Sequence, residues 1–205
     1  MNRIFRIFFL ALLVLLGIVF ICACSNSQES SAPEGSPNPS TSSVIPVYTY
    51  KVVNTYLHDR NAFTQGLVFE DGVSYEGTGH RGRSTLRRVE LETGDIFQMR
   101  DPPPRFFGEG VTIYGSKAIQ LTWQANVGFV YDRNSFELLG DFHYPTEGWG
   151  ITHDGKRLIM SDGTSTLHFL DPETFEEISQ IEVCDNDGPV TRLNELEYVQ
   201  GEIYA

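Results

Sequence analysis

Short stretches in which apolar and polar residues alternate cover most of the chain from about residue 44 onward. They are rich in Val, Ile, Thr, Tyr and Phe, and Gly, Asp and Asn separate them at short intervals. The apolar spacing of three to four residues that marks an amphipathic helix is scarce. Alternation of this kind is typical of half-buried β-strands joined by turns, so the pattern predicts an all-β domain.

The predicted strands form a unit that repeats along the chain. Each unit starts with a strand that leads into a glycine turn, and these glycines (Gly72, Gly115, Gly155 and Gly201) are 43, 40 and 46 residues apart. Four strands at this period are typical of one blade of a β-propeller. A β-sandwich is the alternative, but turns of the same type at the same place in each unit favour the propeller. The expected strand segments are 65–72, 73–76, 85–91 and 96–100 in the first unit, 109–115, 117–121, 128–131 and 137–144 in the second, 147–155, 157–160, 166–170 and 177–183 in the third, and 195–201 and 202–205 in the fourth.

A further strand-like segment, at 47–56, precedes the first unit. It occupies the place that a fourth strand has before the next unit, so we expect it to complete the last blade and close the ring. The chain stops at Ala205, in the second predicted strand of the fourth unit, and three units and part of a fourth do not close a ring. We therefore expect the complete reading frame to add roughly 50–60 residues, a little over one blade.

The first residues read as an export signal. Two arginines precede a short apolar run that ends in Ile-Cys-Ala-Cys at 21–24, and such a sequence is typical of a secretory signal peptide. The ending resembles the lipobox of bacterial lipoproteins, whose cysteine is acylated. An uncleaved membrane anchor is the alternative, because the apolar run just reaches spanning length. We predict a signal peptide at 1–23, a lipidated Cys24 and a flexible tether rich in Ser and Pro at 24–43, and a propeller domain at 44–205.

These features predict a protein that is secreted across the bacterial inner membrane and held in the cell envelope by the lipid on Cys24. The net charge is −12, from 15 Lys and Arg against 27 Asp and Glu, which argues against nucleic acid as a partner. The five histidines are scattered and the cysteines are not paired at ligand spacing, so we predict no metal and no cofactor. We expect a monomer.

The residues just before each first strand are candidates for a binding site. In a propeller the first strands line the central channel, and the residues that precede them gather at one mouth of that channel. Taken alone, each such residue fits a core or turn position. Their shared position instead predicts an apolar pocket with a few convergent polar groups, which is the usual form of a binding site. The candidates are the polar residues Gln65, Glu109, Glu147 and Asn194 and the aromatic residues Phe63, Phe107, Trp123 and Trp149.

Six short motifs at these positions carry a closer resemblance. They are Phe-Thr-Gln-Gly-Leu at 63–67, Phe-Gly-Glu-Gly at 107–110, Gln-Leu-Thr-Trp at 120–123, Glu-Gly-Trp-Gly at 147–150, Met-Ser-Asp-Gly-Thr at 160–164 and Asn-Glu-Leu-Glu-Tyr at 194–198. Over about residues 56–205 the sequence resembles the plant and bacterial type of glutaminyl-peptide cyclotransferase. The resemblance implies a five-bladed β-propeller, incomplete here in its fourth blade. It also implies an enzyme that converts the N-terminal glutamine of peptides to pyroglutamate and releases ammonia without a catalytic metal.

The resemblance also implies roles for individual residues. Glu109 corresponds to the catalytic acid of the family, and Gln65 and Asn194 correspond to its side-chain amides. A tryptophan and a lysine of the family's pocket would lie beyond Ala205. The aromatic walls that bind the substrate correspond to Phe63, Phe107, Trp123 and Trp149.

The expected chemistry suits a single carboxyl group among aromatic walls. The substrate α-amine attacks its own γ-carboxamide, so one group must accept a proton from the amine and then protonate the departing ammonia. Apolar walls would raise the pKa of Glu109 into the range for both steps. Two alternatives remain at this stage: a non-catalytic envelope propeller that binds peptides or protein partners, and a glycosidase that uses Glu109 and Glu147 as a carboxylate pair.

Overall fold

A computed structural model describes residues 48–205. The described residues form strands, turns and irregular segments, and none of their segments is a helix long and apolar enough to cross a membrane. Residues 1–47 lie outside the described residues, and they include the predicted signal peptide, Cys24, the whole of the predicted tether and the first residues of the predicted domain.

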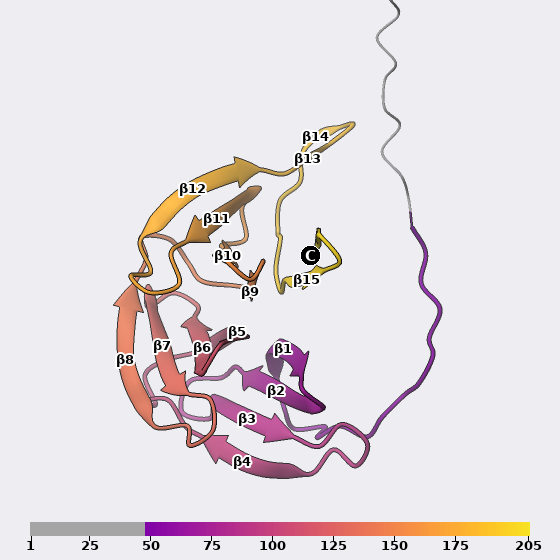
Figure 1. Ribbon diagram of the computed structural model, residues 1–205, viewed down its shortest axis with the longest axis vertical. Helices are drawn as coiled ribbons and strands as arrows, with labels where there is room; N and C mark the ends of the chain where they lie inside the picture. Colours follow the sequence, from indigo (N-terminus) through magenta and orange to yellow (C-terminus); the bar gives the residue numbers. More distant parts are fainter. Residues whose placement is uncertain (1–47) are drawn as a thin grey trace, which may run out of the picture. The chain divides into compact units, whose positions relative to one another are not determined.

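Three antiparallel four-stranded sheets make up most of the described chain (Figure 1). In each sheet the strands follow one another in sequence order, as the repeat predicted. Two short hairpins follow the third sheet. The sheets are β1 (Thr64–Glu70), β2 (Val73–Thr78), β3 (Thr85–Val89) and β4 (Ile96–Arg100); β5 (Gly108–Tyr114), β6 (Lys117–Thr122), β7 (Val127–Asp132) and β8 (Leu138–His143); and β9 (Ile151–His153), β10 (Leu158–Ser161), β11 (Thr166–Leu170) and β12 (Glu177–Glu182), and the hairpins are β13 (Cys184–Asp185) with β14 (Gly188–Pro189) and β15 (Glu197–Val199) with β16 (Glu202–Tyr204).

The sheets are arranged as blades whose first strands face one another. In Figure 1 the strands β1, β5, β9 and β15 lie innermost, and β4, β8 and β12 form the outer rim. Strand β5 contacts both β1 and β9, and β9 contacts β15. This arrangement confirms the predicted β-propeller. The described residues hold three complete blades and the hairpin β15–β16, so the total of five blades stays a prediction.

The apolar core lies between successive blades. A first cluster joins Tyr75 and Leu86 of the first blade to residues of the second blade such as Val111 and Ile113. A second cluster joins the second blade to the third, and a third joins the third blade to Leu196, just before β15. Each blade therefore buries one face against the next, and the second blade, which lies between the first and the third, buries both of its faces.

The same turn joins the third and fourth strands of every blade. The backbone N–H of Gly94, Phe136 and Phe175 each donates to the carbonyl oxygen four residues earlier, and all three have positive φ angles, of 76°, 56° and 60°. The strand pairing shifts by one residue at this point in all three sheets. Because Phe136 is only 2% exposed, burial of its ring in the core between blades offsets the cost of this conformation.

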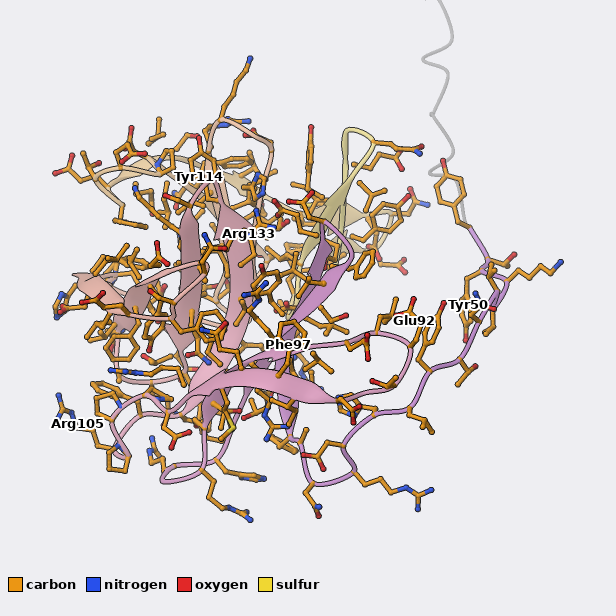
Figure 2. The ribbon with its side chains drawn as sticks, turned by 60° about the horizontal axis from the view of Figure 1, so that its bottom comes forward. Tyr50, Glu92, Phe97, Arg105, Tyr114 and Arg133 are labelled. Carbon is orange, nitrogen blue, oxygen red and sulfur yellow. The ribbon has the colours of Figure 1, made fainter. Side chains whose placement is uncertain are left out.

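The observed strands differ from the prediction at two places. The segment 48–56 forms no strand, and its side chains are exposed: Tyr50 is 91% exposed and lies away from the sheets in Figure 2. An extended segment becomes a strand only by pairing, and the predicted partner blade is represented in the described residues by β15 and β16 alone. The hairpin β13–β14 was not predicted, because its strands of two residues are too short to show alternation.

Candidate active site

The two blades that carry Gln65 and Glu109 present them in the same way. The pairing of β1 with β2 shifts between Thr64 and Gly66, which leaves Gln65 out of the ladder. The pairing of β5 with β6 shifts between Gly108 and Val111, which likewise leaves Glu109 outside the ladder of paired residues. A β-bulge bends its strand and redirects a side chain, and bulges are common beside active sites. The local backbone therefore aims both side chains out of their sheets.

The glycines that follow these residues allow the inner strands to approach closely. A Cβ atom on Gly110 would lie 2.6 Å from the carbonyl oxygen of Trp149, and one on Gly150 would lie 2.0 Å from that of Asn194. The backbone N–H of Gly110 donates to the Trp149 carbonyl at 2.8 Å. The recurring Gly of the Glu-Gly and Trp-Gly motifs thus sets the spacing of the strands that carry the candidate residues.

A pocket of about 390 Å³ lies where these segments meet. It is lined by all seven residues that the sequence predicted for catalysis and substrate binding, together with His80. Its aromatic walls contact one another: the Phe63 and Phe107 rings are 6.2 Å apart, and the Phe107 and Trp123 rings are 5.6 Å apart, both edge to face. The complete lining is Phe63, Gln65, His80, Phe107, Glu109, Trp123, Trp149 and Asn194.

Glu109 has the properties of an acid held in an apolar site. Glu109 is buried, with only 6% of its surface exposed. Burial raises the pKa of Glu109 to about 8, and the negative charge of Glu147 adds to the increase. Within residues 48–205 no group donates a hydrogen bond to its carboxyl, so that carboxyl is available to a molecule in the pocket.

Glu147 holds two of the pocket walls. Its Oε2 atom accepts a hydrogen bond from the indole Nε1 of Trp123 at 2.6 Å and another from that of Trp149 at 2.9 Å. Its Oε1 atom accepts one from Gln124 at 3.2 Å. The bond from Trp149 is the main cause of a lowered pKa, so Glu147 stays ionised. One carboxylate oxygen therefore fixes both tryptophans and keeps a negative charge near Glu109.

Asn194 is positioned through Ser161, a fully buried residue of β10. The Ser161 hydroxyl donates a hydrogen bond to the backbone carbonyl oxygen of Asn194 at 2.6 Å. It also accepts one from the backbone N–H of Gly150 at 2.8 Å. The Trp149 N–H donates to the Ser161 carbonyl at 3.0 Å. Ser161, from the Met-Ser-Asp-Gly-Thr motif, thus ties the segment that bears Trp149 to the loop that bears Asn194.

Glu195 lies next to Asn194 and is a further buried acid beside the candidate site. Its Oε1 atom accepts the N–H of Leu67 on β1 at 3.0 Å, which links the two segments across the mouth. Burial raises the pKa of Glu195 to about 9, with smaller contributions from Glu197 and Glu109. Glu195 does not line the pocket, so Glu109 is the acid that faces it.

The sequence model of the glutamine cyclotransferase family matches residues 18–205. This chain belongs to that family. A glutaminyl-peptide cyclotransferase of Arabidopsis thaliana is 40% identical over 157 residues, which cover 76% of this chain and 49% of that protein. The crystal structure of Myxococcus xanthus glutaminyl cyclase matches with a TM-score of 0.70 at 35% identity, over 75% of this chain and 65% of that one. The chain thus spans about half the length of its Arabidopsis relative.

A more distant likeness concerns the fold alone. The computationally designed Ika4 protein matches with a TM-score of 0.50 at 11% identity, over 72% of this chain and 86% of that one. At 11% identity this likeness shows a similar fold and carries no information about function.

In this glutamine cyclotransferase site, His80 was missed from the sequence, and the role of Glu147 was left open there between a pocket residue and the second carboxylate of the glycosidase alternative. His80 lines the pocket and stacks on Phe63 with ring centres 4.4 Å apart. It follows β2, whereas the sequence analysis selected residues that precede the first strand of each blade. Glu147 was considered as a second catalytic carboxylate, whereas its contacts make it a support for the tryptophans. The part of the chain that the structure describes holds no cluster of three or more His, Cys, Asp or Glu side chains placed to bind a metal.

Proposed function

We propose that this pocket converts the N-terminal glutamine of peptides to pyroglutamate and releases ammonia. The observation that carries the proposal is Glu109, a buried carboxyl with a raised pKa that faces an aromatic pocket beside two side-chain amides. The printed names of the Arabidopsis and Myxococcus relatives support the same reaction. The activity, an aminoacyl transfer within one substrate, belongs to the acyltransferases.

In the proposed reaction the α-amine nitrogen of the substrate attacks the carbon of its own γ-carboxamide. A carbon–nitrogen bond forms and closes a five-membered ring, and the bond to the original amide nitrogen then breaks. Glu109 accepts a proton from the attacking nitrogen and gives one to the departing nitrogen, which leaves as ammonia, so the carboxyl ends in its starting state. Its pKa of about 8 lies close to that of a peptide α-amine, and such matching favours transfer in both directions.

The remaining pocket residues have supporting roles in this proposal. The amides of Gln65 and Asn194 orient the substrate amine and carboxamide or stabilise the oxyanion that develops on the carboxamide oxygen. The aromatic walls favour a folded glutamine whose amine is already near the carbon that it attacks. The glycosidase alternative is disfavoured because the oxygens of Glu147 are engaged by Trp123, Trp149 and Gln124.

The direct test is ammonia release from a peptide that begins with Gln, measured with the full-length protein. A peptide that begins with Asn is the control, because its ring would be one carbon too small. Glu109→Gln keeps the side-chain shape and removes the titratable group, so turnover should fall by at least about 10²–10⁴-fold while peptide binding remains. Wild-type turnover in this variant would assign the acid to another residue, and peptide binding without any ammonia release by the wild type would support the binding propeller instead. EDTA should leave the rate unchanged.

The two amides should matter less than the acid. Gln65→Ala and Asn194→Ala each remove one hydrogen-bonding partner from a site that keeps others, so kcat/KM should fall by roughly 10–10³-fold. A loss as large as that of Glu109→Gln would show that the amide takes part directly in proton transfer.

We also propose that Cys24 is lipidated and holds a monomeric, exported enzyme in the cell envelope. The charged and apolar run before Cys24 and the Ser- and Pro-rich segment after it support this. Cys24→Ser should release the protein from the membrane fraction or leave it unprocessed. Membrane retention with cleavage elsewhere would contradict lipidation at Cys24, and retention without cleavage would favour a bare anchor.

A further inference from the structure

A second, smaller pocket adjoins the candidate active site. It has a volume of about 200 Å³ and shares Phe63 and His80 with the first pocket, so the stacked pair of rings forms a wall between the two. A peptide whose first residue occupies the active site must leave it over the rim. The second pocket therefore lies within reach of the residues that follow the N-terminal glutamine.

The lining of this second pocket is basic although the chain as a whole is acidic. It contains Arg83 and Arg87 and no carboxylate, in a chain with a net charge of −12. The other lining residues offer hydrogen-bonding groups and backbone. They are Asn61, Phe63, Thr78, Gly79 and His80.

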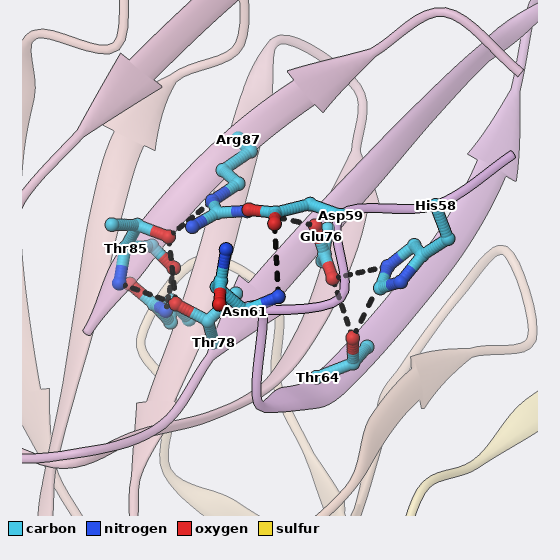
Figure 3. Close-up of polar contacts among 9 residues, drawn as sticks. His58, Asp59, Asn61, Thr64, Glu76, Thr78, Thr85 and Arg87 are labelled. Carbon is cyan, nitrogen blue, oxygen red and sulfur yellow. Dashed lines mark hydrogen bonds and ion pairs between the residues drawn. The ribbon is translucent and has the colours of Figure 1, made fainter. Parts of the chain in front are cut away.

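Arg87 belongs to the fixed floor of the pocket (Figure 3). It is only 9% exposed, donates through Nη1 to Asp59 at 3.0 Å and through Nε to the Thr85 hydroxyl at 2.7 Å. The Asn61 N–H donates to the same Asp59 side chain at 2.9 Å, and this bond and the bond from Arg87 lower the pKa of Asp59. Asp59 therefore remains ionised and neutralises Arg87, so Arg87 is not the group that attracts a ligand.

Arg83 is different, because its guanidinium makes no ion pair or hydrogen bond with any residue in 48–205. Its backbone is nevertheless fixed: the Arg83 N–H donates to the His80 carbonyl at 2.9 Å, and the Ser84 hydroxyl donates to the same oxygen at 2.9 Å. The hydroxyl of Ser84 in turn accepts the N–H of Gly108, at the start of β5, at 3.0 Å. His80 has a φ of 80°, a conformation rare for a residue with a side chain, and such outliers concentrate at functional sites.

We propose that this second pocket is a subsite for a carboxylate of the substrate peptide. Arg83 binds an Asp or Glu side chain one or two residues after the N-terminal glutamine, and the polar floor with Asn61 accommodates its oxygens. The proposal rests on the proposed cyclisation and specifies which peptides the enzyme prefers. It makes the loop that joins β2 to β3, with the sequence Gly-His-Arg-Gly-Arg at 79–83, a specificity element of the active site.

The test compares three peptides, Gln-Ala, Gln-Glu and Gln-Lys at the first two positions with an identical remainder, on the full-length protein. Because Arg83 is exposed, we expect kcat/KM for the Glu peptide to exceed that for the Ala peptide by about 2- to 5-fold, with the Lys peptide below both. High salt should reduce these differences. Arg83→Gln should remove the preference, and Arg83→Glu should invert it in favour of the Lys peptide.

Arg81 provides the matched control. It lies in the same loop and is also exposed, but it lines neither pocket, so Arg81→Gln should keep the preference for Glu. Equal kcat/KM for the three peptides in the wild type would overturn the subsite and leave the cyclisation standing. A preference that Arg81→Gln removes as fully as Arg83→Gln would also overturn it, because the charge of the loop as a whole would then be responsible. Absence of ammonia release from all three peptides would instead refute the proposed function.

Discussion

Strands β1 and β5 occupy the same place in successive blades and carry the same signature, yet their surroundings differ. Each presents a candidate polar residue in a bulge, followed by a glycine and two apolar residues at alternate positions. On β5 those apolar residues, Val111 and Ile113, are each 1% exposed. On β1 their counterparts, Leu67 and Phe69, are 47% and 56% exposed. Strand β5 lies between β1 and β9, so neighbours on both sides, rather than its own sequence, account for its burial.

The difference divides the candidate active site into two halves. Glu109 and the two tryptophans form one half, which we call the covered half because β5 has neighbouring blades on both sides. There burial raises the pKa of Glu109, and Glu147 fixes the indoles. Gln65 and Asn194 are carried by β1 and by the loop before β15, where the residues are more exposed. This division suits their proposed roles, because a proton-transfer group needs desolvation, whereas an amide that orients substrate needs only correct placement.

The largest expected difference between the two strands is in stability. Ile113→Ala should lower the free energy of unfolding by about 2–5 kcal/mol, because it leaves a cavity in the core between the first two blades. Phe69→Ala, at the equivalent position, should change it by less than about 1 kcal/mol. Urea unfolding of the full-length protein measures both. An equally large loss for Phe69→Ala would show that another part of the protein covers β1.

The glycines after the bulges give a smaller difference. A Cβ atom on Gly110 would meet the backbone of β9 and its preceding residues, 2.6 Å from the Trp149 oxygen, and one on Gly66 would lie 2.4 Å from the Val111 nitrogen. Gly110→Ala should cost about 1–3 kcal/mol and reduce activity, because β5 is confined on both sides and Glu109 must move with it. Gly66→Ala should cost less, because β1 can move outward. Gly140→Ala is the control, since its Cβ would meet nothing within 4 Å, and equal losses for Gly66 and Gly110 would remove the distinction between the strands.

The blades were predictable from sequence because the information for them is local. Each four-stranded sheet pairs neighbouring strands through short turns, and Gly72, Gly115 and Gly155 mark those turns at intervals of 43 and 40 residues. The segment 48–56 was misread because alternation shows that a strand is possible, whereas pairing depends on a partner distant in sequence. The two-residue strands β13 and β14 are below the length at which alternation carries information.

The pocket was predictable as a set of positions, and its internal contacts were not. The shared place of Gln65, Glu109 and Asn194 before or at the first strands identified residues that meet in space. Glu147 accepts hydrogen bonds from Trp123, which is 24 positions away in the sequence, and from Trp149, which is two positions away. These contacts depend on side-chain geometry, which sequence spacing does not predict. His80 enters the pocket because a loop with two residues of positive φ folds back over Phe63, which the sequence did not reveal.

The smallest effect that we predict concerns the charge of Glu147 in the covered half of the site. Glu147→Gln keeps an oxygen that can accept both indole hydrogen bonds but removes the negative charge that helps to raise the pKa of Glu109. In the proposed reaction Glu109 starts as the carboxylate that accepts the proton of the amine, so the acid limb of the kcat/KM profile that follows Glu109 should move to lower pH, by a fraction of a unit because burial is the larger cause. The ionisation of the substrate amine, which also acts on the acid side, should stay in place.

Glu147→Ala separates the positional role of this carboxylate from its charge. Trp123 and Trp149 both donate to Glu147, so the change in tryptophan emission between the wild type and each Glu147 variant reports on these walls. The Ala variant should shift the emission spectrum and raise KM, because both indoles lose their acceptor, whereas the Gln variant should change neither. If Glu147→Ala left emission and KM unchanged, the walls would be held by packing, and the covered half of the site would owe its order to the neighbouring blades alone.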